Sequence, residues 1–355
     1  MRNKFWGDSL IMKALVLEDV KKMSVKEIAD PTIDENGVLV KVKANGVCRS
    51  DWHVWAGDIP ISSPVMGHEL TGIVEEVGKN VTRFKSGDRV IVPFSGNDGT
   101  CPHCLKGNTN LCDSFIIPGA TYSGGYGEYV PVPLGDRNVI HLPEEVSFTD
   151  GAALGCRFMT AFHGLVDQVD LLPGEWVVVY GCGGVGLSVI NIASAIGANV
   201  IGVDINEDNL QLAKSMGAMY TINSKNTNPV EAVKEITKGG ADVSVDALGI
   251  PQTCVSGINS LKKAGRHLQI GVTTKKEAGF ISIPVDQMVM NEIKFMTTLG
   301  MPAHRYNNLL PMVAQGRLTP GKMVTGEISL SEVNSIFEGM SNFTTKGTYV
   351  VTSFE

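Results

Sequence analysis

The chain has 355 residues, 43% of them hydrophobic and 19% charged, which is the composition of a globular protein long enough for two domains with separate cores. Its formal net charge of −7 argues against a nucleic acid or an anionic membrane as a partner. No apolar run reaches the roughly 18 residues that a membrane-spanning helix needs. Residues 1–11 lack the apolar core and cleavage site of a signal peptide, so we expect a short extension there, either an upstream reading or a tail.

The first part of the chain is predicted to be β-structure. As far as about residue 150, short runs of β-type residues are broken by Gly, Pro and Asp, without long helical periodicity. We expect one strand to begin at Met12 and others at 38–42, 72–77, 89–92 and 127–132.

After residue 175 strands and helices alternate. An apolar run at 176–180 is followed by the turn GCGGVG and a helix of small residues at 187–196. Further strands are predicted at 199–203, 242–245, 266–271 and 294–297, and further helices at 208–216 and 253–262. This alternation indicates an α/β fold with a doubly wound parallel sheet that is buried on both faces.

Beyond residue 299 the alternation fades into helices at 306–315 and 331–340 and a last strand at 348–352. We therefore expect a dinucleotide-binding domain at 156–298, inserted into a β-rich domain. The β-rich domain would comprise 12–155 plus 299–355, and 1–11 would be an N-terminal extension.

The turn at 181–186 has the spacing of a dinucleotide-binding motif. Gly181, Gly183 and Gly186 fit G-x-G-x-x-G directly after a strand and at the start of a helix, whose N-terminus would face the phosphates. Asp204 ends the next strand, where its carboxylate can bind the ribose hydroxyls and repel a 2′-phosphate. NAD is therefore favoured over NADP, and a glycine-rich turn without a ligand is the alternative.

Potential metal ligands and proton carriers are concentrated in 22 residues of the chain, and a downstream Cys156 can complete the set. Thiolate and neutral imidazole are preferred ligands of Zn²⁺, and three protein ligands with one open position are typical of a catalytic site. The residues concerned are Cys48, Ser50, Asp51, His53, His68 and Glu69.

These motifs resemble the zinc-dependent alcohol dehydrogenases of the medium-chain dehydrogenase/reductase family. The most specific matches are CRSDWH at 48–53, GHE at 67–69, the cysteine lobe at 98–112, LGC at 154–156 and GCGGVG. The resemblance covers nearly the whole chain, from about Met12 to Phe354. It implies a Rossmann doubly wound sheet inserted into a GroES-like β-rich catalytic domain.

The resemblance implies that the catalytic zinc is held by Cys48, His68 and Cys156, with the fourth position open to water or to the substrate oxygen. Glu69 would lie behind the metal, and Asp51 would accept a hydrogen bond from the other ring nitrogen of His68. Cys156 distinguishes the chain from polyol-dehydrogenase relatives, which use a carboxylate in that place. The alternative is that these residues are buried core thiols and a structural histidine.

A proton must leave the alcohol before its carbon gives up hydride. Zn²⁺ lowers the pKa of a bound oxygen acid strongly, to about 7 for water. By the resemblance, Ser50 takes the hydroxyl proton and His53 passes it to solvent. The alternative for His53 is a surface histidine beside Trp52.

Several further positions match cofactor contacts of the family. Arg49 would contact the pyrophosphate, Thr160 would support the nicotinamide, and Leu248 and Val272 would line the cofactor. The full expected set is Arg49, Thr160, Gly181, Gly183, Gly184, Val185, Gly186, Asp204, Leu248 and Val272. Relatives often carry a phosphate-contacting arginine near the C-terminus, but Thr348 occupies that place, with Lys346 nearby as an alternative cation.

The cysteine lobe departs from the usual family pattern of four cysteines. Asp98 occupies the first position, ahead of Cys101, Cys104 and Cys112, and a carboxylate oxygen can also bind zinc. We expect these four residues to hold a structural zinc; a metal-free lobe and a redox pair of thiols are the alternatives. His103 breaks the ligand spacing and is expected to be solvated.

The resemblance places Trp52, Trp55, Phe94 and Ile117 in the substrate pocket, although each could equally belong to the core. Bulky aromatic side chains would favour apolar alcohols over polyols. The alternatives to an NAD-dependent alcohol dehydrogenase are a zinc-free enone or quinone reductase of the same fold and a non-catalytic NAD-binding redox-responsive protein. The intact ligand trio and the Ser50–His53 pair argue against both.

Cysteine use and segment length bear on location and assembly. The seven cysteines lie in ligand-like spacings rather than in a disulfide framework, which favours the cytoplasm. The short segment between Cys112 and Gly127 resembles family members that are homotetramers. The physiological substrate cannot be inferred from the sequence.

Overall fold

The computed structural model describes residues 11–342 and 344–355. The chain forms two compact units. The first unit comprises residues 11–155, Gly326–Thr345 and Tyr349–Glu355, and the second comprises Cys156–Thr325 and Lys346–Thr348. Residues 1–10 of the expected extension lie outside the described residues, and Ile11 already belongs to the first strand.

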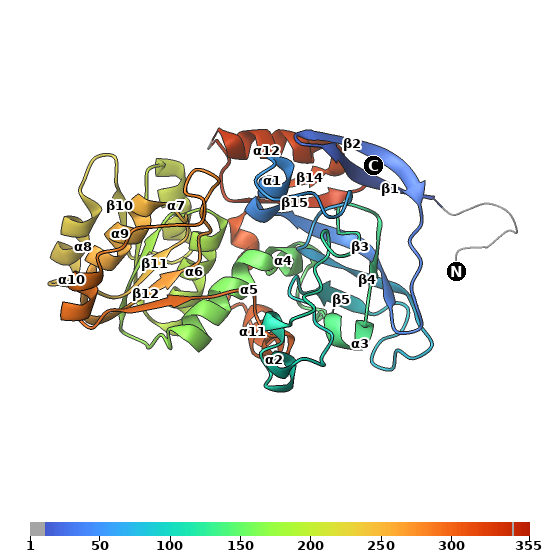
Figure 1. The fold of residues 1–355 in the computed structure, drawn as a ribbon, viewed down its shortest axis with the longest axis horizontal. Coiled ribbons are helices and arrows are strands. Elements are labelled where there is room, and N and C mark those ends of the chain that lie inside the picture. Colours follow the sequence, from blue (N-terminus) through green and yellow to red (C-terminus); the bar gives the residue numbers. More distant parts are fainter. Residues whose placement is uncertain (1–10, 343) are drawn as a thin grey trace, which may run out of the picture. The chain divides into compact units, whose positions relative to one another are not determined.

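The first unit is built on a seven-stranded sheet and a two-stranded hairpin, as expected for its β-rich sequence. The order of the sheet is β14-β15-β3-β4-β5-β7, with β6 paired to β3, and the hairpin is β1-β2 (Figure 1). The pairs of β3 with β4, β6 and β15 and of β4 with β5 are antiparallel. The strands are β1 Ile11–Asp19, β2 Lys22–Ala29, β3 Val38–Val47, β4 Leu70–Val77, β5 Arg89–Val92, β6 Tyr129–Val132, β7 Ile140–His141, β14 Val324–Ser329 and β15 Thr348–Ser353.

Short helices connect these strands. They are α1 Arg49–Trp55, α2 Pro102–Leu105, α3 Gly135–Asn138, α4 Phe148–Ala153 and α12 Val333–Ser341. The sequence did not predict the first four, because helices of four to seven residues are too short to show helical periodicity. The strand β2 was missed because its burial does not alternate.

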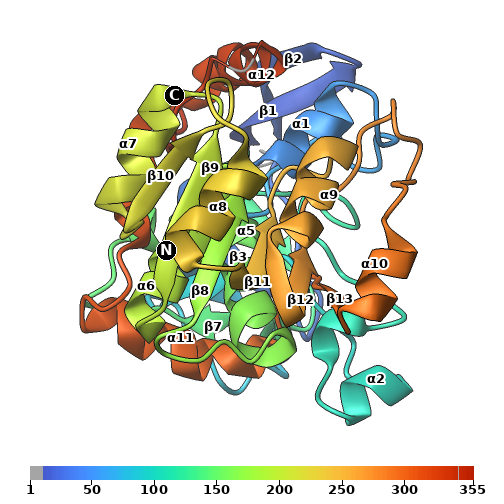
Figure 2. The same cartoon turned by 90° about the vertical axis from the view of Figure 1, so that its left-hand side faces the viewer.

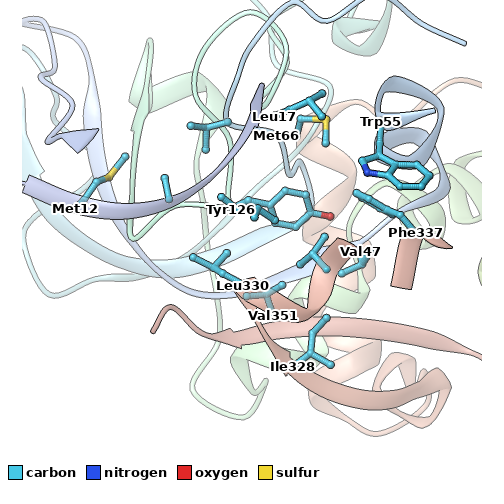
Figure 3. Close-up of a cluster of buried hydrophobic side chains, with 14 of the residues drawn as sticks. Met12, Leu17, Val47, Trp55, Met66, Tyr126, Ile328, Leu330, Phe337 and Val351 are labelled. Carbon is cyan, nitrogen blue, oxygen red and sulfur yellow. The ribbon is translucent and has the colours of Figure 1, made fainter. Parts of the chain in front are cut away.

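A buried apolar cluster holds α1 and α12 against the hairpin. It contains Trp55, Tyr126 and Phe337, with exposed fractions of 3%, 0% and 0%, together with Met12, Leu330 and other residues. Figure 3 shows Trp55 and Phe337 side by side, and their ring centroids are 5.6 Å apart. The helix that carries the first half of the metal motif is thus fixed by packing against the C-terminal part of the chain.

The second unit contains a six-stranded sheet of order β10-β9-β8-β11-β12-β13, in which each strand pairs in parallel with its neighbours (Figure 2). This confirms the predicted doubly wound sheet. The strands are β8 Trp176–Tyr180, β9 Asn199–Asp204, β10 Tyr220–Asn223, β11 Ala241–Asp246, β12 Leu261–Gln269 and β13 Lys294–Thr297. The helices are α5 Cys156–His163, α6 Gly184–Ile196, α7 Glu207–Ser215, α8 Pro229–Thr237, α9 Pro251–Asn259, α10 Val285–Met290 and α11 Tyr306–Ala314.

One helix predicted for this unit is corrected. The helix expected at 253–262 ends at Asn259, and Lys262 belongs to β12, because the backbone of Leu261 pairs with Ala241 in the sheet. Strand β10 and helices α8 and α10 were not predicted.

The C-terminal boundary of the second unit is also corrected. It extends to Thr325 rather than to 298. The added segment bonds to earlier parts of this unit: the Arg305 side chain pairs with Asp167, and the backbone amide of Thr319 donates to Asn191 of α6 at 2.9 Å. These long-range contacts leave no trace in local sequence. The boundary at Gly155–Cys156 agrees with the prediction.

Within the described residues, no helix is long and apolar enough to cross a membrane.

We predict that replacing Phe337 by alanine lowers the free energy of unfolding by about 3–5 kcal/mol, because it leaves a cavity beside Trp55. Denaturant titration measures the change. Leu172→Ala serves as the control because this side chain is 53% exposed, and its effect should stay within about 0.5 kcal/mol. A loss below about 1 kcal/mol for Phe337→Ala would show that this cluster does not support the first unit.

Candidate metal and cofactor sites

Three side chains that are far apart in sequence converge on one point. A ligand atom of each of Cys48, His68 and Cys156 lies within 4.8 Å of the other two. Cys48 follows β3 and caps α1, His68 lies two positions before the start of β4, and Cys156 opens α5. Zn–S and Zn–N bonds of about 2.3 and 2.0 Å separate the ligands of one tetrahedral ion by roughly 3.5–4 Å. The trio therefore fits a single zinc ion.

The orientation of His68 supports this fit. Its Nδ1 lies 2.9 Å from Oδ1 of Asp51, whereas its buried Nε2 has no hydrogen-bond partner. A buried polar atom without a partner is costly unless a ligand takes it. Burial by itself lowers the pKa of His68, but the Asp51 carboxylate and Cys48 together outweigh burial and raise this pKa well above its ordinary value. The partnerless Nε2 is the nitrogen that the trio directs at a metal.

Asp51 is a buried carboxylate that accepts hydrogen bonds from several segments of the chain. Besides His68, it accepts hydrogen bonds from Tyr126 Oη at 3.0 Å, from the amide of Gly67 at 3.3 Å and from the amide of Cys48 at 3.3 Å. Burial and the nearby Asp51 charge raise the pKa of Tyr126 well above its ordinary value, so its hydroxyl remains a donor. Tyr126 was not predicted, and no local motif distinguishes it from other core tyrosines.

Glu69 follows His68 in the chain and is fully buried, and its place behind a metal stays a prediction. A Cβ on Gly155 would lie 2.4 Å from Cβ of Glu69, which is too close for any side chain. Glycine is therefore required immediately before Cys156, and this explains the middle residue of the motif LGC.

The two expected proton carriers lie on α1. Ser50 Oγ is 3.5 Å from Cys48 Sγ, and Nδ1 of His53 is 2.9 Å from Oδ2 of Asp58. Asp58 was missed by the sequence analysis, although an acidic residue five positions after a candidate relay histidine is a usable signal. Its carboxylate fixes one ring nitrogen of His53 and leaves the other to carry a proton.

Two phenylalanine rings lie near His68, one in contact with its imidazole and the other in contact with the first ring. The ring of Phe94 is 5.9 Å from the His68 ring, and that of Phe115 is 6.2 Å from Phe94. Phe94 was predicted to line the pocket, whereas Phe115 was not. Ile117 is half-buried, and its backbone amide donates to Oγ1 of Thr121 at 2.8 Å; its place in a pocket stays a prediction.

The prediction that Trp55 lines the pocket is wrong. Its indole belongs to the core cluster with Phe337, and its Nε1 donates to Asn334 at 3.0 Å. The packing of α1 on α12 turns it inward. Trp52 also packs against this cluster while half-buried, with Nε1 donating to Ser341 at 2.8 Å, so its place in a pocket stays a prediction.

The cysteine lobe also brings its thiols together. Ligand atoms of Cys101, Cys104 and Cys112 lie within 4.8 Å of one another, and Cys112 Sγ is 3.4 Å from Oδ1 of Asp98. A backbone hydrogen bond from Thr100 is the main cause that lowers the pKa of Asp98 to about 2, so the carboxylate is charged. The His103 side chain is exposed, as expected. The three thiols form one local group that suits a second zinc ion, and Asp98 borders this group at Cys112.

The glycine-rich turn has the geometry of a dinucleotide-binding loop. Gly181 has φ +92°, a left-handed conformation that favours glycine, and a Cβ on Gly186 would lie 1.7 Å from the carbonyl oxygen of Gly181. A Cβ on Gly183 would meet nothing within 4 Å, which leaves open space beside that backbone. Gly184 and Val185 begin α6, whose N-terminus follows the turn.

The other expected cofactor residues surround this turn or lie near it. Asp204 accepts hydrogen bonds from the amides of Cys182 and Asn206 at 2.7 and 2.8 Å, which fixes its carboxylate at the end of β9. Leu248 and Val272, at the ends of β11 and β12, are 44% and 73% exposed. Exposed apolar side chains of this kind offer a surface that a bound ligand could cover.

The side chains of Thr160 and Arg49 each make contacts within their own unit. The hydroxyl of Thr160 donates to the carbonyl of Cys156 at 2.6 Å. The guanidinium of Arg49 stacks 3.9 Å over the Trp52 ring and donates to the carbonyl of Met340 at 2.9 Å. Their roles in cofactor binding stay predictions.

Known proteins are similar to this chain over most of its length. Residues 34–144 match the family described as alcohol dehydrogenase GroES-like domain, and residues 184–315 match zinc-binding dehydrogenase. An alcohol dehydrogenase of Geobacillus stearothermophilus is 33% identical over 93% of this chain and 96% of its own length, and one of a Moraxella species is 34% identical over 96% and 99%. The solved structure of the alcohol dehydrogenase TADH from Thermus sp. ATN1 matches with a TM-score of 0.88 at 29% identity, over 96% of this chain and all of that one.

The chain belongs to the zinc-type alcohol dehydrogenases of the medium-chain dehydrogenase/reductase family. It is an NAD-linked oxidoreductase that interconverts an alcohol and its aldehyde or ketone, with Zn²⁺ and NAD as cofactors. The zinc-free reductase and the non-catalytic NAD-binding protein are not favoured.

For this alcohol dehydrogenase we predict that Asp51→Asn weakens zinc binding at the trio by about 10- to 100-fold, because the amide keeps the shape of the carboxylate but not its charge. Competition with a zinc-binding dye measures the affinity. Asp58→Asn is the matched control, since it removes a carboxylate from His53 and should leave zinc affinity unchanged. Equal zinc affinity in the wild type and Asp51→Asn would contradict the orienting role of Asp51.

Proposed function

We propose that turnover in this alcohol dehydrogenase depends on a zinc ion held by Cys48, His68 and Cys156, with the fourth position left to substrate. The observation that carries the proposal is the buried, partnerless Nε2 of His68 beside two thiols. Two thiolates and one neutral imidazole are a ligand set of catalytic zinc sites.

Bound there, Zn²⁺ supplies the Lewis acidity that polarises the substrate oxygen, and NAD supplies the hydride acceptor or donor. The chain's own residues do the rest. Asp51 holds the proton on Nδ1 of His68, which leaves Nε2 as the ligand atom. Phe94, 8% exposed and packed on the His68 ring, excludes water from that side.

The alcohol proton leaves through Ser50 and His53 in this proposal. Ser50 stands next to the metal ligand Cys48, and His53 lies one helical turn further along α1. The Asp58 carboxylate stabilises the positive charge that His53 acquires when it takes the proton, and in the reverse reaction the same path returns it. His53 and Asp58 are therefore proposed to act as a pair.

We propose that Asp98, Cys101, Cys104 and Cys112 hold a structural zinc. A closed four-ligand site adds stability but has no open position for substrate. The lobe lies on short elements that cannot form a core of their own, which is why a metal would be useful there.

The substrate is proposed to be an alcohol with an apolar or aromatic substituent. The side chains placed next to His68 are Phe94 and Phe115, which offer apolar contacts and no hydrogen bonds to further hydroxyl groups. A polyol would leave its hydroxyls without partners against these rings.

We predict that the purified protein contains about two zinc ions per chain. Cys48→Ser should retain one and lose activity by about 10³-fold or more, because several kcal/mol of charge stabilisation disappear. Cys104→Ser should retain the trio ion, keep part of the activity and melt at a lower temperature. Elemental analysis and an NAD-linked alcohol assay measure these quantities.

Full activity after complete removal of metal by a chelator would contradict the zinc mechanism. Loss of one ion in Cys104→Ser with no change in melting temperature would contradict only the structural role of the lobe.

We also propose a homotetramer in the cytoplasm. None of the seven cysteines forms a disulfide, which suits a reducing compartment. The strand β13 is an edge of the six-stranded sheet, and apolar side chains near it are exposed. Phe280 is 82% exposed, Met290 81% and Val289 69%. An apolar surface beside an open sheet edge suits pairing with a second copy of the chain.

The assembly prediction is that Val289→Glu reduces the mass measured by light scattering to that of a smaller oligomer, because it places a charge in an apolar interface. Met219→Glu is the control, since this residue is 56% exposed but lies next to β10 at the opposite edge of the sheet. A wild-type monomer, or an unchanged mass in Val289→Glu, would count against an interface here.

A further inference from the structure

A second buried carboxylate lies at the end of strand β11 in the second unit. Asp246 is fully buried, and both of its oxygens accept hydrogen bonds. Oδ1 accepts from the amide of Leu248 and from Oγ1 of Thr253, both at 2.9 Å, and Oδ2 accepts from Nε2 of Gln269 at 2.9 Å. The amide of Gly249 lies 3.3 Å from each oxygen. A buried charge is costly unless such donors hold it, so these bonds fix the carboxylate in one orientation.

Asp246 belongs to a polar array of four side chains on one face of the six-stranded sheet. Ser244 and Asp246 are two residues apart on β11 and so share a face. The register of the sheet pairs them with His267 and Gln269 of the neighbouring strand β12 (Figure 2). Nε2 of His267 lies 3.2 Å from Oε1 of Gln269, and its Nδ1 lies 2.8 Å from Oγ of Ser244. Because Oε1 of Gln269 faces His267, the amide nitrogen of Gln269 is directed at Asp246.

The same carboxylate joins the loops that follow β11 and β12. Nε2 of Gln269, which bonds to Asp246, also donates to the carbonyl of Gly271 at 2.8 Å. The backbone carbonyl of Asp246 accepts from the amides of Ile270 and Gly271 at 3.0 and 2.9 Å. The two loops also touch directly, because a Cβ on Gly271 would lie 2.2 Å from the amide nitrogen of Gly249. Asp246 therefore fixes both loops through its side chain and its backbone.

Each of these loops carries an exposed apolar side chain. Leu248 is 44% exposed, and Val272 is 73% exposed. A Cβ on Gly181 would lie 2.6 Å from Cγ of Leu248, so Leu248 packs on the first residue of the dinucleotide turn. In a parallel α/β sheet, ligands bind at the carboxyl ends of the strands, which is the edge where both loops begin.

We propose that Asp246 is a positioning residue for the cofactor. By holding both loops, it keeps the side chains of Leu248 and Val272 where they cover bound NAD. The inference rests on NAD being the cofactor and on these two side chains contacting it. Asp246 acts through them and does not touch NAD itself, because it is fully buried. Loops that are fixed before binding lose less conformational entropy when the cofactor arrives, and this favours affinity.

The bonding pattern requires a carboxylate rather than an amide at this position. Both oxygens of Asp246 face donors: Oδ1 faces the amide of Leu248, and Oδ2 faces the amide nitrogen of Gln269. An asparagine has one acceptor oxygen and one NH₂ group, so in either orientation a donor would face a donor. Asp246→Asn therefore keeps the volume of the side chain and loosens one of the two loops.

The test measures the dissociation constant of NADH by fluorescence titration on the zinc-loaded protein, together with the melting temperature. We expect Asp246→Asn to weaken NADH about 10-fold, because contacts with the cofactor lose their fixed geometry. Asp242→Asn is the matched control at the opposite end of β11. Its carboxylate accepts from the amide of Trp176 at 2.9 Å and pairs with Lys262, so the change should lower the melting temperature but alter NADH binding by less than about 2-fold.

Two further variants separate positioning from general stability. Gln269→Met removes the bonds to Asp246 and Gly271 with a side chain of similar length. NADH should bind to it with an affinity between those of the wild type and Asp246→Asn, and it serves if Asp246→Asn fails to fold. In a Leu248→Ala/Val272→Ala background, Asp246→Asn should weaken NADH by less than about 2-fold, because the side chains through which it acts are gone.

The proposal is overturned if Asp246→Asn binds NADH as tightly as the wild type, or if Asp242→Asn weakens NADH by as much. It is also overturned if Asp246→Asn keeps its full effect in the Leu248→Ala/Val272→Ala background, which would indicate a general structural role. An unchanged NADH affinity in Leu248→Ala/Val272→Ala alone would reject the contacts on which it rests. Failure of the wild type to bind NADH would instead reject the cofactor assignment itself.

Discussion

The buried carboxylate of Asp51 is the interaction on which the metal site depends. It lies at 3% exposure and is tolerated there because it accepts hydrogen bonds from His68, Tyr126 and two backbone amides. These donors come from the loop before α1, the loop before β4 and the loop before β6, so one charge holds three segments in register. It also decides which ring nitrogen of His68 is left for a metal. Burial alone would disfavour this carboxylate; its bonds make it the centre around which the ligands are arranged.

Glycines set the second constraint, by letting other groups approach. Gly155 admits Glu69 behind the metal ligands, Gly186 admits the carbonyl of Gly181 beneath α6, and Gly184 admits Arg157 at the helix end. In each case an added Cβ would lie between 1.7 and 2.6 Å from another atom. The two candidate cofactor sites are thus shaped by missing side chains as much as by potential ligands.

The fold could be predicted where the sequence signal is local. The apolar run at β8, the turn after it and the following strand and helix gave the doubly wound sheet, because a parallel sheet buried on both faces needs continuous apolar strands. Local sequence patterns gave wrong boundaries where strand pairing or contacts between distant residues determine the structure. Leu261 continues a helical pattern but pairs with Ala241 of β11, and the segment before Thr325 joins the second unit through Asn191 and Asp167. The contacts of Thr319 with Asn191 and of Arg305 with Asp167 join residues more than a hundred positions apart, which no window of sequence records.

The candidate site divides in the same way. The sequence by itself determined the residue types and spacing that suit zinc and a dinucleotide, because ligand chemistry and the glycine turn are properties of side chains and short motifs. Only the tertiary structure decided which groups contact them: Tyr126 contacts Asp51, Asp58 contacts His53, and Phe115 contacts Phe94. It also moved Trp55 into the core, since α12 covers one face of α1. The physical reason is that orientation and burial depend on what packs from distant parts of the chain, whereas the capacity to bind a metal depends on the side chain alone.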